Sequence, residues 1–168
     1  MALHLVIDGY NLLGASSHDA FRDIEAERER LIAALAAYKR LKRVKLTAVF
    51  DGTSSKRLTR SREMRSGIEV IFSRDGEEAD RILKDLAREK KGSVTIVTSD
   101  RDVASYAESN GAVTVGSDEF RRLLDLALYE DMKGVKTEDE EEGARDKKGP
   151  SRKEPKALRR KMNRLKKL

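Results

Sequence analysis

The sequence predicts a three-layer α/β fold in which helices cover both faces of a mainly parallel sheet of about five strands. Short runs of apolar and β-branched residues alternate along the chain with longer segments whose apolar residues recur at helical spacing. Several of the short runs end directly in an aspartate, followed by a glycine or by more polar residues. This alternation is typical of parallel sheets, because a helix connects each strand to the next one in the same direction.

A long helix separates the first two expected strands. Residues 3–7 are apolar apart from one histidine and end at Asp8, and residues 44–50 form a second buried run. The helix between them is expected over 19–43 after a loop, with Asp19 as its N-terminal cap. Its buried face is expected to consist of Ile24, Leu31, Leu35, Tyr38 and Leu41.

Residues 53–66 lack a clear period and are expected to form a mobile basic loop. They contain five cations and a single acid, Glu63. A basic loop of this kind is suited to contact a polyanion such as a phosphate backbone. The predicted binding residues for such a polyanion are Lys56, Arg57, Arg60, Arg62 and Arg65.

The second half of the chain repeats the strand and helix pattern. A strand over 67–72 precedes a helix over 77–90, and Asp80 lies in the first turn of that helix. The nearly continuous apolar run at 93–98 is typical of a central parallel strand. The remaining expected elements are a helix that ends near residue 110, a strand over 112–115 and a last helix capped by Ser117 or Asp118.

The net charge of +6 is distributed unevenly along the chain. Residues 132–168 hold 14 Lys/Arg and 7 Asp/Glu, a net charge of +7, which leaves −1 for residues 1–131. We therefore divide the chain into a folded domain over 1–131 and a charged tail over 132–168. The tail is too poor in apolar residues to order itself. Its end, 156–168, has leucines and a methionine at helical spacing and is suited to form an amphipathic helix on a partner.

Composition narrows the expected environment and cofactors. The chain has no cysteine, so it has no disulfide and no thiolate metal site, and a cytoplasmic location is expected. No run approaches the roughly 20 apolar residues of a membrane span, and no signal peptide is recognisable. We therefore expect no membrane partner. No phosphate-binding loop or dinucleotide fingerprint is present, so we expect no nucleotide cofactor either.

Carboxylates recur where the expected strands end. Asp8 follows the first strand, Asp51 the second, and Asp100 and Asp102 the fourth, while Asp80 begins a neighbouring helix. Carboxylates that meet at one sheet edge repel one another unless a cation neutralises them. Oxygen ligands without His or Cys favour Mg²⁺ or Mn²⁺. Each aspartate taken singly is also explained by a turn or a helix cap, and this reading applies most strongly to Asp51.

The motifs DGYN, FDG, GEEADRIL and VTSDRDV occur in this order, and together they resemble the NYN domain, specifically its YacP-like branch among the PIN-like ribonucleases. The resemblance covers residues 2 to about 130, and it implies that RNA is the polyanion bound by the basic residues of the segment 53–66. It implies a metal-dependent endoribonuclease whose metal is bound by Asp8, Asp80 and Asp100, with Asp102 as a supporting acid. It also implies that Asn11 lies near the metal or the scissile phosphate, and it suggests cleavage of mRNA on translating ribosomes.

Two other functions remain open at this stage. The chain is alternatively a non-catalytic factor that binds RNA or the ribosome and retains a vestigial acidic site. It is also compatible with a Toprim-like phosphotransfer domain, because Asp100 and Asp102 form a DxD pair, although that fold requires glutamate where this chain has Asp8. Asn11 has a simpler role available in hydrogen bonding to local backbone. With 5% aromatic residues, base stacking is not expected.

Overall fold

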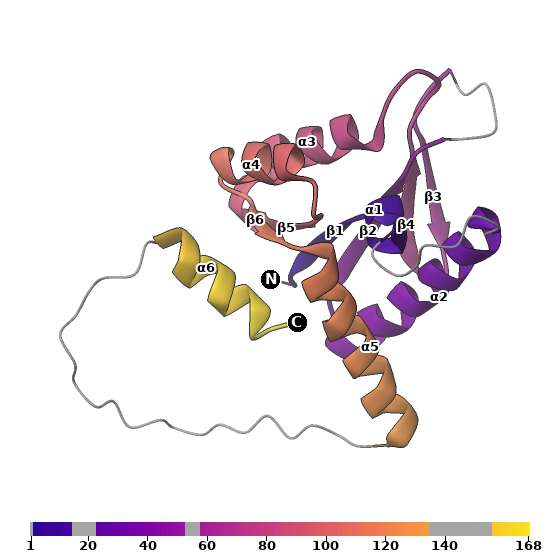
Figure 1. Ribbon diagram of the computed structural model, residues 1–168, viewed down its shortest axis with the longest axis vertical. Coiled ribbons are helices and arrows are strands. Elements are labelled where there is room, and N and C mark those ends of the chain that lie inside the picture. Colours follow the sequence, from indigo (N-terminus) through magenta and orange to yellow (C-terminus); the bar gives the residue numbers. More distant parts are fainter. Residues whose placement is uncertain (1, 15–22, 53–57, 135–155) are drawn as a thin grey trace.

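The computed structural model describes residues 2–14, 23–52, 58–134 and 156–168. It confirms an α/β fold with a mostly parallel sheet between layers of helices (Figure 1). The strands are β1 (His4–Asp8), β2 (Lys45–Phe50), β3 (Ser61–Arg65), β4 (Ile68–Phe72), β5 (Val94–Val97) and β6 (Val113–Val115). The helices are α1 (Gly9–Gly14), α2 (Ile24–Lys42), α3 (Ala79–Lys90), α4 (Arg101–Ser109), α5 (Ser117–Lys133) and α6 (Lys156–Leu165), with a 3₁₀ turn, η1 (Lys91–Ser93), after α3.

The strand order β3-β4-β2-β1-β5-β6 places β1 near the middle of the sheet. β1 pairs in parallel with β2 on one side and with β5 on the other. All pairs are parallel except β3 with β4. The carboxyl ends of five strands therefore meet at one edge of the sheet, where ligands bind in open α/β folds.

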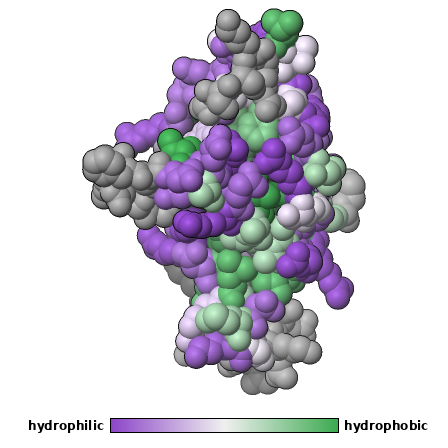
Figure 2. Space-filling model, turned by 90° about the vertical axis from the view of Figure 1, so that its right-hand side faces the viewer, coloured by the Kyte–Doolittle hydropathy of each residue, from purple (hydrophilic) through white to green (hydrophobic). Residues whose placement is uncertain are grey.

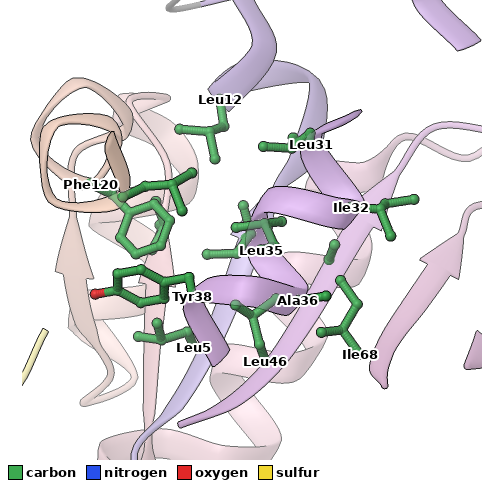
Figure 3. Close-up of a cluster of buried hydrophobic side chains, with 14 of the residues drawn as sticks. Leu5, Leu12, Leu31, Ile32, Leu35, Ala36, Tyr38, Leu46, Ile68 and Phe120 are labelled. Carbon is green, nitrogen blue, oxygen red and sulfur yellow. The ribbon is translucent and has the colours of Figure 1, made fainter. Parts of the chain in front are cut away.

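Each face of the sheet has its own hydrophobic core, because successive side chains of a strand point to opposite faces. Leu5 of β1 joins a cluster with residues of α2 and α5, and Figure 3 shows Leu35 and Tyr38 of α2 beside Phe120 of α5. Val6, the next residue of β1, joins the opposite cluster with α3 and α4. Helices thus pack against both faces of β1 and fix the position of its carboxyl end.

The expectation of a mobile loop over 53–66 is wrong for residues 61–65. They form β3, an antiparallel edge strand that makes the sheet six-stranded rather than five-stranded. Ser66 and Gly67, with φ of 49° and 82°, form the two-residue turn between β3 and β4. Two consecutive positive φ values suit a tight hairpin, which is a local signal that the charged sequence of β3 obscured. Lys56 and Arg57 lie outside the described residues.

Three helix starts differ from expectation. α2 begins at Ile24, and Asp23 caps it by accepting a hydrogen bond from the backbone N–H of Ala26 at 3.1 Å; Asp19 lies outside the described residues. The glycine after β1 starts the short helix α1 at once. The N-cap of α5 is Gly116 rather than Ser117 or Asp118, because Ser117 is already in the helix.

The terminal helix α6 packs on the chain's own domain beside β6 (Figure 1). Leu168 is 4% exposed and belongs to the core on the α2 side, with its carbonyl oxygen bound by the Tyr38 hydroxyl at 2.5 Å. Arg164 donates to the carbonyl of Gly92 at 2.7 Å. Part of the apolar surface that the sequence assigned to a partner is thus buried within this chain.

Charged and apolar groups are mixed over the outer surface. Seen from the side of α2 and β3, a band of hydrophobic surface lies between charged groups (Figure 2). Exposed apolar side chains in the structure include Leu41 of α2, Met64 of β3 and Tyr129 of α5. Among the described helices, none has both the length and the apolar character that crossing a membrane requires.

His4, at the start of β1, gives the fold a testable pH dependence. It is buried and hydrogen-bonded through Nε2 to the Thr47 hydroxyl at 2.9 Å, and Thr47 in turn donates to Glu69. Burial, with Lys45 and Lys90 nearby, lowers the pKa of His4 to about 4. Since the unfolded histidine takes up a proton near pH 6.5, the folded state loses stability as the pH falls from there to about 4.

We expect this loss to amount to roughly 2 kcal/mol relative to His4→Gln, which stays neutral and can still donate to Thr47. Urea unfolding of both proteins between pH 7 and pH 4 measures the difference. If the two proteins show the same pH dependence, His4 is not the group that titrates.

Candidate active site at the carboxyl edge of the sheet

Four aspartates lie where the carboxyl edge of the sheet meets α3 and α4. Asp8 is the last residue of β1, and Asp51 directly follows β2. Asp100 follows β5 and is the N-cap of α4, while Asp80 lies in the first turn of α3. The parallel pairing of β1 with β2 and β5 brings these chain segments to one edge although they are far apart in sequence.

Asp8 is the most deeply buried of these carboxylates, with 6% of the residue exposed. The Thr98 hydroxyl donates a hydrogen bond to its Oδ2 at 2.8 Å. The pKa of Asp8 is raised to about 6, mainly by burial and also by the negative charges of Asp80 and Asp51, while hydrogen bonds from Thr98 and the Asn11 backbone oppose the rise. A buried carboxylate beside others of its kind is the state that a bound cation relieves.

Asp80 is half-buried, and its pKa is also raised. Burial is the main cause that raises its pKa, followed by the charges of Asp100 and Glu78, while Lys84 opposes the rise. Asp8 and Asp80 therefore lie within electrostatic reach of each other, and both retain excess negative charge in their surroundings.

Asp51 and Asp100 each use one oxygen to cap a helix. Oδ1 of Asp51 accepts from the backbone N–H of Ala79, the first residue of α3, at 2.6 Å. Oδ1 of Asp100 accepts from the N–H groups of Asp102 and Val103 at 2.8 and 3.1 Å. The capping role expected for Asp51 is thus present, but the cap serves a helix 28 residues away rather than the adjacent segment.

Asp102 is exposed and contacts a cation rather than the other aspartates. Its side chain is 79% exposed and forms an ion pair with Lys84 of α3. The predicted supporting role of Asp102 therefore stays a prediction, and the observed contact joins α4 to α3.

Asn11 links three elements at the edge of the site. Its Oδ1 accepts from the backbone N–H of Ser99 at 2.8 Å and from the hydroxyl of Ser117 at 2.5 Å. Ser99 completes the link, since its Oγ accepts from the N–H of Ser117 at 2.9 Å. The hydrogen bonds hold α1 against the ends of β5 and β6, so the structure gives Asn11 a positioning role; its direct role at a phosphate stays a prediction.

Thr98 and Ser117 were not predicted as parts of this site. Both are buried, with 2% and 1% exposure, and both donate to a residue of the DGYN motif. Their positions were the one sequence feature that could have indicated them, because each hydroxyl lies within two residues of the end of a parallel strand. Hydroxyl residues are common at strand ends, so position alone could not identify their partners.

We expect Asn11→Ala to lower the free energy of unfolding by roughly 1–2 kcal/mol, because the buried Ser117 hydroxyl and the Ser99 N–H lose their acceptor. Asn11→Asp keeps an acceptor oxygen and should recover most of this loss. Urea unfolding of the two variants measures the difference. Equal stability of Asn11→Ala and the wild type would contradict the positioning role.

The carboxylates fit a hard divalent cation by chemistry. They supply only oxygen donors, and a cation would neutralise the charges of Asp80 and Asp51, which contribute to the raised pKa of Asp8 after its burial. Within the described residues, however, no three His, Asp or Glu side chains are gathered closely enough to hold a metal ion. The metal-binding role predicted for Asp8, Asp80 and Asp100 therefore stays a prediction.

The described members of the predicted RNA-binding set all contact acids of the chain. Arg60 binds Glu77 with two nitrogens and reaches Asp85 at 2.7 Å, so it fastens the segment before β3 to α3. Arg62 and Arg65 lie on β3 and pair with glutamates, Arg62 with Glu69 and Arg65 with Glu29 and Glu63. Their contact with RNA remains a prediction, and these ion pairs would have to exchange for it.

Known proteins of similar sequence and structure share this fold. A family model, the YacP-like NYN domain, matches residues 5–167. Two crystal structures of Rae1 (YacP) from Bacillus subtilis, one of them of a single-residue mutant, are similar to this chain at 24% identity. The mutant structure has a TM-score of 0.64 over 79% of this chain and 80% of that chain, and the other has 0.59 over 78% of each. No curated protein sequence matches significantly.

Proposed function

Since this chain belongs to the YacP-like NYN domain family of PIN-like ribonucleases, we propose that it is a metal-dependent endoribonuclease that cleaves RNA phosphodiester bonds. The observation that carries the proposal is the shared electrostatic environment of Asp8, Asp80 and Asp100. The pKa of Asp8 rises partly because of Asp80, and that of Asp80 rises partly because of Asp100. A purely structural use of these aspartates gives no reason to keep uncompensated charge at one sheet edge.

In this proposal Asp8, Asp80 and Asp100 would hold Mg²⁺ or Mn²⁺. A cation held there would supply a water molecule of lowered pKa and positive charge beside the scissile phosphate. Thr98 orients the Asp8 carboxylate through its hydroxyl hydrogen bond. The α4 amides orient Asp100 in the same way, and Asp102 assists from the adjacent position of that helix.

The alternative is a non-catalytic RNA-binding or ribosome-binding factor. The burial of Asp8 speaks against it, because a carboxylate freed from catalysis can be replaced by a neutral residue that costs less to bury. Membership of the NYN family separates the chain from Toprim-like domains, the third possibility that the DxD pair had left open.

The purified chain is expected to cut RNA internally in Mg²⁺ or Mn²⁺ and to stop when EDTA removes the cation. Fragment mapping on a single-stranded RNA and on mRNA bound to translating ribosomes measures this activity. Cleavage that persists in EDTA would overturn the metal dependence. Binding without cleavage of either substrate would favour the non-catalytic alternative.

We also propose that translating ribosomes present the preferred mRNA substrate, as the resemblance to the YacP-like branch suggests. Cutting of ribosome-bound mRNA should then be faster than cutting of the same RNA free in solution. Equal rates on both substrates would contradict this part of the proposal and leave the nuclease activity itself intact.

A further inference from the structure

A groove of about 690 Å³ lies on the outer surface of α3 and α4 and begins at Asp80. The two helices pack side by side on the same face of the sheet (Figure 1). Besides Tyr106, its lining holds four cations and five acids: Arg74, Arg81, Lys84 and Arg88, and Glu77, Glu78, Asp80, Asp85 and Asp102. Asp80 is the member of the proposed metal-binding set that lines this groove, so the groove adjoins the proposed cleavage site through Asp80.

Three cations follow the length of α3 within this groove. Arg81, Lys84 and Arg88 are three, four and seven residues apart, so they lie on one side of the helix. At 1.5 Å of rise per residue, Arg81 and Arg88 are about 10 Å apart along the helix axis. Arg81 and Arg88, the two ends of this row, are suited to phosphates of an extended strand, while Lys84 pairs with Asp102.

Three of the five acids of the groove have cationic partners. Glu77 and Asp85 are bound by Arg60 at 2.6 and 2.7 Å, Asp102 forms an ion pair with Lys84, and Asp85 also contacts Arg88 at 3.2 Å. The side chain of Arg88 is 60% exposed. Among the described residues Arg81 has no ion pair. Arg81 and Arg88 are therefore available to a phosphate.

Tyr106 provides an aromatic surface in the same groove. It is half-buried, and Nζ of Lys84 lies 5.6 Å from its ring centroid. The phenylalanines of the described core, Phe50, Phe72 and Phe120, are buried and have no such access. An accessible ring beside a row of cations is the combination by which proteins bind unpaired nucleotides.

We propose that this groove binds a single-stranded stretch of RNA that flanks the cleaved bond, with Arg81 and Arg88 on phosphates and Tyr106 stacked on a base. The proposal rests on the proposed function for the place of the cut, but it concerns binding and is tested without cleavage. A single strand is required because stacking on Tyr106 needs an unpaired base.

The test measures binding of a fluorescein-labelled 12-nucleotide single-stranded RNA to the full chain by anisotropy in EDTA, where cleavage does not interfere. Tyr106→Ala is expected to weaken binding roughly tenfold, within the range known for the loss of one stacked base. Tyr106→Phe retains the ring and should bind like the wild type. Tyr129→Ala, which removes an exposed tyrosine from α5, is the matched control and should also leave binding unchanged.

The double variant Arg81→Ala/Arg88→Ala is expected to reduce the slope of log affinity against log salt by about 1.4, since each phosphate contact on a single strand contributes about 0.7. Arg30→Ala/Arg40→Ala removes the same charge from exposed positions of α2 and should leave the slope close to wild type. Thermal melting of every variant verifies folding.

The proposal is overturned if Tyr106→Ala binds as tightly as Tyr129→Ala, or if both arginine pairs change the slope equally. A duplex of the same sequence that binds as tightly as the single strand would also overturn it. Normal binding by a chain that never cleaves RNA would instead count against the proposed nuclease function and leave the groove assignment standing.

Discussion

Asp8→Asn is expected to abolish RNA cleavage and, in metal-free buffer, to stabilise the fold. The expected fall in kcat is about a hundredfold or more, the scale seen when one group that stabilises transition-state charge is removed. Asparagine has nearly the same shape and keeps an oxygen that can accept from the Thr98 hydroxyl. A loss of activity with a retained fold would therefore report on the charge of Asp8.

The gain in stability has a defined pH dependence. The pKa of Asp8 is raised to about 6 in the folded chain, whereas an unfolded aspartate titrates near 4. Below pH 4 the residue is protonated in both states, so the two proteins should be equally stable. Above pH 6 the folded wild type carries a buried charge, which corresponds to roughly 3 kcal/mol in favour of Asp8→Asn.

Thermal melting with and without MnCl₂ links this result to the proposed metal. The melting temperature of the wild type should rise with MnCl₂, because a ligand that binds only the folded state stabilises it. The melting temperature of the variant should change much less. Asp125→Asn, on an exposed part of α5, is the matched control. If Asp8→Asn cleaves RNA at the wild-type rate, Asp8 is not a residue of the active site.

Gly9→Ala is expected to destabilise the domain and to reduce cleavage, because no space exists for a side chain at this position. A Cβ on residue 9 would overlap the ring of Phe50, with Cζ only 2.7 Å away. Phe50 is fully buried, stacks on Phe72 and makes an edge contact with Tyr10, so it has little freedom to move. Overpacking of this kind costs about 1–3 kcal/mol, which corresponds to a melting temperature lower by roughly 5–10 °C.

Gly14→Ala at the other end of α1 is the matched control, because nothing lies within 4 Å of a Cβ there. It should melt close to the wild-type temperature. Cleavage should fall in Gly9→Ala alone, because the shift of α1 also moves Asp8, its neighbour in the chain. If both variants behave like the wild type, Phe50 relaxes more easily than its packing indicates.

Sequence periodicity predicted most of the sheet because each strand obeys a local rule. Apolar runs such as 93–98 are required wherever both faces of a strand are covered, and helices cover both faces here. β3 was missed because an edge strand needs no apolar run: Arg62 on one face and Arg65 on the other pair with glutamates while the backbone pairs with β4. The Ser66-Gly67 turn was the only local sign of it.

The candidate site was also predicted only in part from the sequence. That Asp8, Asp80 and Asp100 belong to one edge follows from the order of strands and helices, which the sequence displays. Which of them is buried, and which hydroxyl each one meets, depends on the neighbouring strands. Thr98 could be paired with Asp8 only once β1 and β5 were known to be adjacent.

By itself the sequence determined the α/β class, the family and the aspartates at the carboxyl ends of the strands, because these depend on residue type and spacing along the chain. The tertiary structure decided that Asp51 caps α3, that Gly9 is required by the ring of Phe50, and that Arg60 is held by Glu77. These contacts join residues that lie from 17 to more than 40 positions apart. Local patterns carry no record of such pairings, since they arise only when the packed layers bring distant segments together.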